Sequence, residues 1–116
     1  MLLMNFKYWF RHWLAYQCVA IKLRAWKPKY LLHDAEKPWM QIFMNHGKVQ
    51  KWHRTHRKHH VEYDSPEKVD WEAAVIDWEC ARYTKLDKPL NARETMEQYY
   101  PQYESYIIPV LKKFGL

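Results

Sequence analysis

The stretch SPEKVDWEAAVIDWECARYTK, residues 65–85, decides the fold that the sequence predicts. Ser65 is a favourable N-cap and Pro66 is favoured at the first helical position, so we expect a helix over residues 66–85. Acidic side chains in its opening turns suit the positive end of the helix dipole. The helix should have two unlike faces, because apolar residues recur on one side and small residues on the other.

The face of small side chains surrounds one carboxylate, that of Asp77. This face consists of Asp70, Ala73, Ala74, Asp77, Cys80, Ala81 and Thr84, and the apolar stripe consists of Trp71, Val75 and Trp78. Small neighbours let a second helix approach closely, and Asp77 would then point into the contact. A carboxylate is costly to bury unless a cation or a donor meets it. Glu72 and Glu79 are expected on the solvated surface.

A second long helix is expected near the start of the chain. No Gly or Pro interrupts residues 3–26, and Pro28 then disfavours helix at the residue before it. The residues that fit one amphipathic helix are Phe6, Phe10, Trp13, Leu14, Gln17, Val19, Ile21 and Leu23. His12 lies in the middle of this helix.

Shorter helices should follow. We expect them over residues 30–38, over residues 39–45 with Gly47 as the C-terminal cap, and over residues 49–60. The C-terminal part predicts an Asn91/Glu94 capping box for a helix to about Tyr100, and a last helix that Pro101 opens, Pro109 kinks and Gly115 ends. With 116 residues, two Gly and no strand pattern, the sequence predicts an all-α, single-domain compact bundle of five to six helices over residues 1–116.

The net charge indicates which class of partner to expect, and the cysteine content indicates the cellular compartment. The formal net charge of +6 favours an anionic partner such as a nucleotide, another phosphorylated small molecule or a nucleic acid. Cys18 and Cys80 are too few and too far apart for a disulfide framework, and we expect both to be buried, reduced thiols. Residues 1–10 match neither a signal peptide nor a membrane span. The sequence therefore predicts a cytoplasmic protein without a membrane partner.

Histidines concentrate in one segment, HRTHRKHH at residues 53–60, which holds four of the seven in the chain. On a helix, at about 100° per residue, these four fall within an arc of about 120°. The basic residues Arg54, Arg57 and Lys58 fall on the other side. This arrangement predicts a helix with metal-ligating histidines on one face and solvated basic residues on the other.

Four successive predicted helices each offer a metal ligand. The candidate ligands are His12, His33, Asp34, His53, His59, His60 and Asp77. Imidazole and carboxylate together suit one or two divalent ions, among Mn, Fe, Ni, Co, Zn and Mg. Individually each residue has a structural explanation, and a histidine on an apolar helix such as His12 is more often a core residue than a ligand.

This order of motifs resembles the HD-domain metal-dependent phosphohydrolase superfamily, and most closely a small HD-like family found in phages and bacteria. The motifs are HDAEK at residues 33–37, HRTHRKHHVEY at residues 53–63 and DW at residues 77–78. The resemblance covers about two thirds of the chain, from His12 to Lys85. The chain departs from the family in having no Gly after the HD pair and no downstream substrate-recognition motif.

The resemblance implies an all-helical fold around a metal centre. It implies one site made by His12, His33, Asp34 and Asp77, and a second made by His53, His59 and His60 that is bridged through Asp34. It also implies that Lys37 faces the substrate phosphate, so that Asp34 and Lys37 are the expected catalytic residues. We expect Arg54, His56 and Arg57 to contact the substrate. Glu62 is expected to orient a ligand histidine.

The function these observations favour is a metal-dependent phosphohydrolase that acts on a nucleotide or a related phosphoester through a metal-activated water. Two alternatives stay open: a di-iron oxygenase of the HD type, and a non-catalytic basic protein that binds nucleic acid or a protein partner. A chain this short leaves little material for a pocket wall, which favours a homo-oligomer. For a phage-encoded protein the compartment would be the host cytoplasm.

Overall fold

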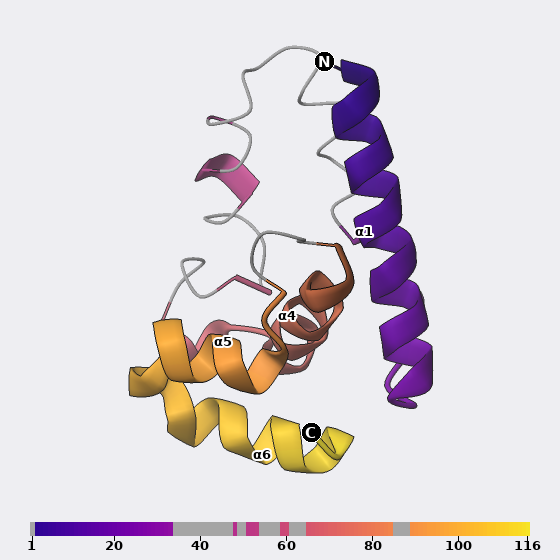
Figure 1. Cartoon of the computed structure of the whole chain (residues 1–116). Helices are drawn as coiled ribbons and strands as arrows, with labels where there is room; N and C mark the ends of the chain where they lie inside the picture. Colours follow the sequence, from indigo (N-terminus) through magenta and orange to yellow (C-terminus); the bar gives the residue numbers. More distant parts are fainter. Residues whose placement is uncertain (1, 34–47, 49–50, 54–58, 61–64, 85–88) are drawn as a thin grey trace.

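Figure 1 shows the computed structural model, which describes residues 2–33, 48, 51–53, 59–60, 65–84 and 89–116. Over these residues the protein is all-α, as predicted, and contains no strand. The α-helices are α1 (Leu2–Lys22), α4 (Trp71–Thr84), α5 (Ala92–Tyr99) and α6 (Glu104–Phe114). Short 3-10 helices are η1 (Pro28–Leu32), η3 (Pro66–Lys68) and η4 (Pro101–Tyr103).

Helix α4 is the element on which the other helices pack. Helix α1 lies against one side of it, and α5 and α6 lie against another (Figure 1). The apolar core is built mainly from α4 and from residues that face it. Its members are Tyr16, Val19, Ala20, Tyr30, Val69, Trp71, Ala73, Ala74, Val75, Ile76, Cys80, Ala92, Met96, Ile107, Leu111 and Phe114.

The face of small side chains on α4 is buried against α1, as its composition predicted. Ala73 and Ala74 are buried there, and the Tyr16 hydroxyl donates a hydrogen bond to the carbonyl oxygen of Ala73 at 3.2 Å. Burial raises the pKa of Tyr16, so the hydroxyl keeps its proton and remains a donor. Close approach of the two helices thus brings side chains of α1 onto the α4 backbone.

The face that α1 buries differs in part from the predicted one. Over residues 7–22, whose side chains the structure describes, the buried residues are His12, Tyr16, Gln17, Val19 and Ala20. By contrast, Phe10, Leu14 and Ile21 are 46%, 47% and 62% exposed. Gln17 and Val19 are buried as predicted, but apolar spacing alone missed His12 and Tyr16, which contact the Asp77 carboxylate and the Ala73 carbonyl oxygen of α4.

Helix α1 also ends four residues earlier than predicted, so Pro28 is not the residue that ends it. The backbone N–H of Arg24 donates to Ile21 O at 3.0 Å, and that of Ala25 donates to Ala20 O at 2.9 Å. Arg24 has a φ of 57°, in the left-handed region. These two bonds and this conformation define a Schellman motif, in which glycine is usually preferred at the left-handed position.

Replacement of Arg24 by glycine should therefore stabilise the protein. Left-handed backbone costs a non-glycine residue about 1–2 kcal/mol, and the added freedom of glycine in the unfolded chain cancels part of the gain. We expect a net gain of about 0.5–1 kcal/mol for Arg24→Gly in urea denaturation. Lys22→Gly, inside the last turn of α1, is the matched control and should destabilise by about 1 kcal/mol. Equal effects of the two changes would contradict this explanation.

The single helix predicted over residues 66–85 is divided in two. Residues Pro66–Lys68 form η3, the chain is extended at Val69, and α4 begins at Trp71. Ser65 makes no capping hydrogen bond; the carboxylate of Asp70 instead accepts one from the N–H of Ala73 at 3.1 Å. Lys29 lies 2.6 Å from the same carboxylate. Burial raises the pKa of Asp70, but the bonds from Lys29 and Ala73 outweigh it and hold that pKa below its usual value.

Asp70 should thus contribute a pH-dependent part of the stability. A folded-state pKa below the unfolded one gives stability that is fully present above the unfolded pKa, about 3.9, and is lost as pH falls through the folded-state value. Asp70→Ala should cost about 1 kcal/mol at neutral pH through loss of the cap. Asp70→Asn, which can still cap, should cost less. Urea denaturation should show the parent and Asp70→Asn converging in acid, and a constant difference at all pH values would be inconsistent with this role.

The C-terminal elements largely follow the prediction. Asn91 and Glu94 form the expected capping box of α5, and Gly115 ends α6 in the left-handed conformation with a φ of 72°. Pro101 begins the 3-10 helix η4, and Pro109 lies within α6.

Two sequence expectations about exposure are wrong. Glu79 is buried rather than solvated, because its carboxylate accepts a hydrogen bond from the N–H of Ala92 at the start of α5 and lies 2.9 Å from Arg82. Cys18 is exposed rather than buried, whereas Cys80 is buried as predicted; neither forms a disulfide bond.

Between α1 and η3 the structure tests only part of the prediction. The helix expected from residue 30 is present as η1, which ends at Leu32. Residues 51–53 are helical, but His59 lies in a turn and His60 in a bend, so the helix expected to reach residue 60 does not. The helix predicted over residues 39–45 and its cap Gly47 lie outside the described residues.

Candidate metal centre

Asp77 of α4 lies at a meeting point of three segments of the chain. Its Oδ1 is 2.8 Å from Nε2 of His12, on α1, and 3.2 Å from Nε2 of His33, which follows η1. The two Nε2 atoms are 3.3 Å apart. Three potential ligand atoms thus form a nearly equilateral triangle inside the protein, since His12 and His33 are buried and the Asp77 side chain is only 15% exposed.

The dimensions of this triangle fit a metal ion. Ligand atoms about 2.1 Å from one ion are about 3.0 Å apart when they subtend a right angle and about 3.4 Å apart in a tetrahedron. The three measured separations lie close to or within this range. Two imidazoles and one carboxylate are also a donor set that divalent transition metals accept. The residues present therefore could hold a metal ion. His12, Asp77 and Cys80 form a further group whose ligand atoms lie within 4.8 Å of one another.

Electrostatics keep the carboxylate of this triangle ionised. Burial raises the pKa of Asp77, but the hydrogen bonds and the positive charge that His12 and His33 offer outweigh burial and hold the pKa of Asp77 well below its usual value. Metals bind the deprotonated carboxylate. Asp77 is thus in the form that a cation requires.

His33 is held in place by side chains of α1. The Tyr16 ring stacks on the His33 imidazole with centroids 3.8 Å apart and an interplanar angle of 17°. Gln17 Nε2 donates to the carbonyl oxygen of Tyr30 at 2.6 Å, and Trp13 Nε1 donates to that of Leu31 at 3.0 Å. These bonds fasten η1 to α1. The position of His33 at the end of η1 follows from them.

A second group of histidines adjoins the triangle through His59. One ligand atom each from His33, His59 and Asp77, and likewise from His53, His59 and His60, lie within 4.8 Å of one another. Nε2 of His53 is 3.2 Å from Nε2 of His59, and His53 has no exposed surface. The two groups share His59, so the imidazoles form one continuous cluster from α1 to residue 60.

Of the predicted metal ligands, the structure therefore brings together His12, His33, His53, His59, His60 and Asp77. The remaining predicted site residues lie outside the described residues: Asp34, Lys37, Arg54, His56, Arg57 and Glu62. The sequence placed Cys80 on the face that surrounds Asp77 but did not identify Tyr16 as a neighbour of the centre. The spacing of Tyr16, one turn from His12, is the signal that could have found it.

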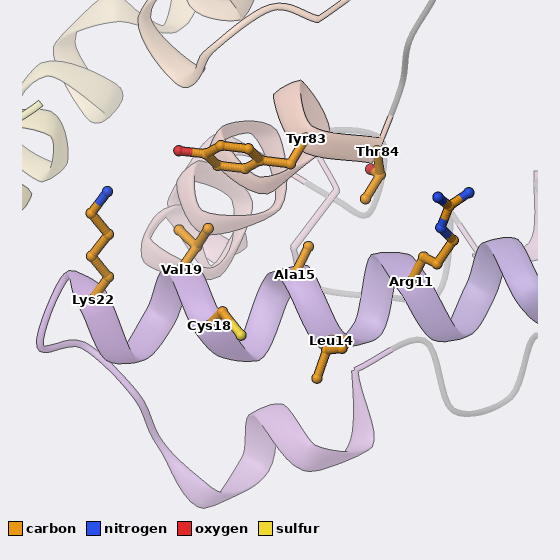
Figure 2. A pocket seen from close by; sticks show the side chains of 8 residues that line it. All are labelled: Arg11, Leu14, Ala15, Cys18, Val19, Lys22, Tyr83 and Thr84. Carbon is orange, nitrogen blue, oxygen red and sulfur yellow. The ribbon is translucent and has the colours of Figure 1, made fainter.

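A groove beside α1 is separate from this cluster. Figure 2 shows Arg11 and Lys22 toward its two ends, with Tyr83 between them on the α4 side. Its volume is 480 Å³, and it is lined by Arg11, Leu14, Ala15, Cys18, Val19, Lys22, Tyr83 and Thr84. No described histidine is among the lining residues.

Metal binding should raise the melting temperature. An ion that binds only the folded state at one hundred times its Kd adds about 2.7 kcal/mol of stability. We expect added Zn²⁺ or Co²⁺ to raise Tm of the chelator-treated protein, and excess chelator to reverse the shift. Asp77→Asn should remove most of the shift. His56→Ala is the matched control, since His56 is not a predicted ligand, and a shift that survives Asp77→Asn unchanged would argue against this centre.

Comparisons of the chain with protein-family models, with curated proteins and with solved structures find no match. No helix in the described part of the chain is long and apolar enough to cross a membrane. The resemblance to the HD-domain superfamily accordingly remains a prediction from three motifs. The geometry around Asp77 is the basis on which a function can be argued.

Proposed function

We propose that the protein is a metal-dependent phosphohydrolase that acts on a nucleotide or a related phosphoester. The observation that carries the proposal is the triangle of Asp77 Oδ1, His12 Nε2 and His33 Nε2, with sides of 2.8, 3.2 and 3.3 Å. His53, His59 and His60 adjoin the triangle and bring the cluster to six buried or half-buried side chains with ligand atoms.

Each group of residues has a role in this proposal. His12, His33 and Asp77 would hold one ion, and His53, His59 and His60 would hold another, with His59 between them. Asp34, which adjoins His33 in the sequence, is the predicted bridging ligand. A bound divalent ion lowers the pKa of a coordinated water and offsets charge on a phosphoryl oxygen.

Charge on the chain supports an anionic substrate. The formal net charge is +6, and α1 carries three cations and no acidic residue over its whole length. Lys37, Arg54 and Arg57 are the residues that the sequence predicts for contact with the phosphate. The ionised Asp77 would be shielded from that phosphate by the ion it binds.

Turnover with defined metals tests the proposal. Chelator-treated protein should release phosphate from at least one member of a broad nucleotide and phosphoester panel after addition of Mn²⁺, Co²⁺, Ni²⁺ or Mg²⁺. Asp77→Asn and Asp34→Ala should abolish the release, because each removes a charged ligand. Asp70→Asn makes the same chemical change at the residue that precedes α4 and lies outside the proposed ligands. This variant should retain activity at a temperature where it is folded.

The metal content of the purified protein distinguishes phosphohydrolysis from the two alternative functions. Bound metal without turnover on the whole panel would contradict phosphohydrolysis. Stoichiometric iron in protein purified without oxygen would then favour oxygen chemistry at the same ligands. Nucleic-acid binding that weakens with salt and ignores chelators would favour the non-catalytic alternative.

A further inference from the structure

The second ring nitrogen of His12 has a defined neighbour. While Nε2 faces Asp77 and His33, Nδ1 lies 3.7 Å from the sulfur of Cys80. Cys80 has no exposed surface and lies three residues after Asp77 on α4. Two residues one turn apart on α4 thus contact the two opposite nitrogens of one imidazole, which fixes the ring in its plane.

The position of the thiol hydrogen follows from a third contact. The sulfur of Cys80 is 3.1 Å from the backbone carbonyl oxygen of Asp77, which can only accept a hydrogen bond. The thiol hydrogen therefore lies on that bond. The sulfur is left to face His12 with its lone pairs, and it can accept a hydrogen bond from Nδ1–H.

We propose that Cys80 is a positioning residue that selects which nitrogen of His12 binds the metal. With its proton held at Nδ1 by the Cys80 sulfur, a neutral His12 presents a lone pair at Nε2 to the triangle. Histidine ligands usually donate their other N–H to a neighbouring acceptor, and removal of that acceptor weakens metal binding. This inference rests on the metal centre of the proposed function but not on hydrolysis.

The separation between His12 Nε2 and Asp77 Oδ1 identifies the Nε2 side of the ring as the side that a cation would occupy. At 2.8 Å these two atoms need a proton or a cation between them, because two acceptors at that distance repel.

Three substitutions separate positioning from packing. Cys80→Ala removes the acceptor, Cys80→Ser keeps a group that can donate to Asp77 O and accept from Nδ1, and Cys18→Ala changes the exposed cysteine as a control. Zinc affinity, measured by competition with a chromophoric chelator, should fall about 10–100-fold in Cys80→Ala. Cys80→Ser should recover most of the affinity, and Cys18→Ala should match the parent. The Tm of each metal-free variant reports whether it is folded.

Nitrogen-15 NMR of the histidine rings provides a readout that packing does not move. In the zinc-bound parent protein, the His12 ring should show a proton on Nδ1 and zinc on Nε2. Zinc on Nδ1, or a metal-free neutral ring protonated only at Nε2, would overturn the inference. Equal zinc affinity of all four proteins would overturn it too while leaving the metal centre intact. Absence of zinc binding to the parent would overturn both.

Discussion

The contact of Asp77 with His12 and His33 is the interaction on which the arrangement of the helices depends. A carboxylate that is 15% exposed has lost most of its hydration, and only donors and positive charge offset that cost. His12 on α1 and His33 after η1 supply them. Phe10 and Leu14 of α1 remain exposed while Val19 and Ala20 are buried, so the orientation of α1 serves both the contact with Asp77 and apolar burial.

Local signals in the sequence predicted the parts of the fold that local physics controls. The Asn91/Glu94 capping box and the Gly115 stop are short-range hydrogen-bond and φ requirements, and both are present. The Ser65 cap and the exposure of Glu79 were predicted wrongly because contacts with residues from other elements took precedence. Asp70 replaced Ser65 as a cap once Lys29 could pair with it, and Glu79 became buried because the start of α5 needed an acceptor.

The candidate metal centre, like the fold, could be predicted in part from the sequence. The small side chains around Asp77 predicted a close helix contact with a partner for the carboxylate, and His12 and His33 fill that role. Spacing places the residues that support these histidines one helical turn from His12 and Asp77, but it does not show which ring each of them contacts. Tyr16 stacks on His33 and Cys80 faces His12 only because α1 and α4 cross at a particular rotation, which depends on the tertiary packing of both helices.

The contact between His12 and Asp77 joins residues 65 positions apart. Closing a loop of this length carries a length-dependent entropy cost of about 4 kcal/mol, which increases only with the logarithm of the number of residues. A ligand held by both side chains therefore acts as a reversible cross-link between the first helix and the centre of the chain. Separation of α1 from α4 would have to break that link, so a ligand bound at the centre would slow global unfolding and would set the lifetime of the folded state.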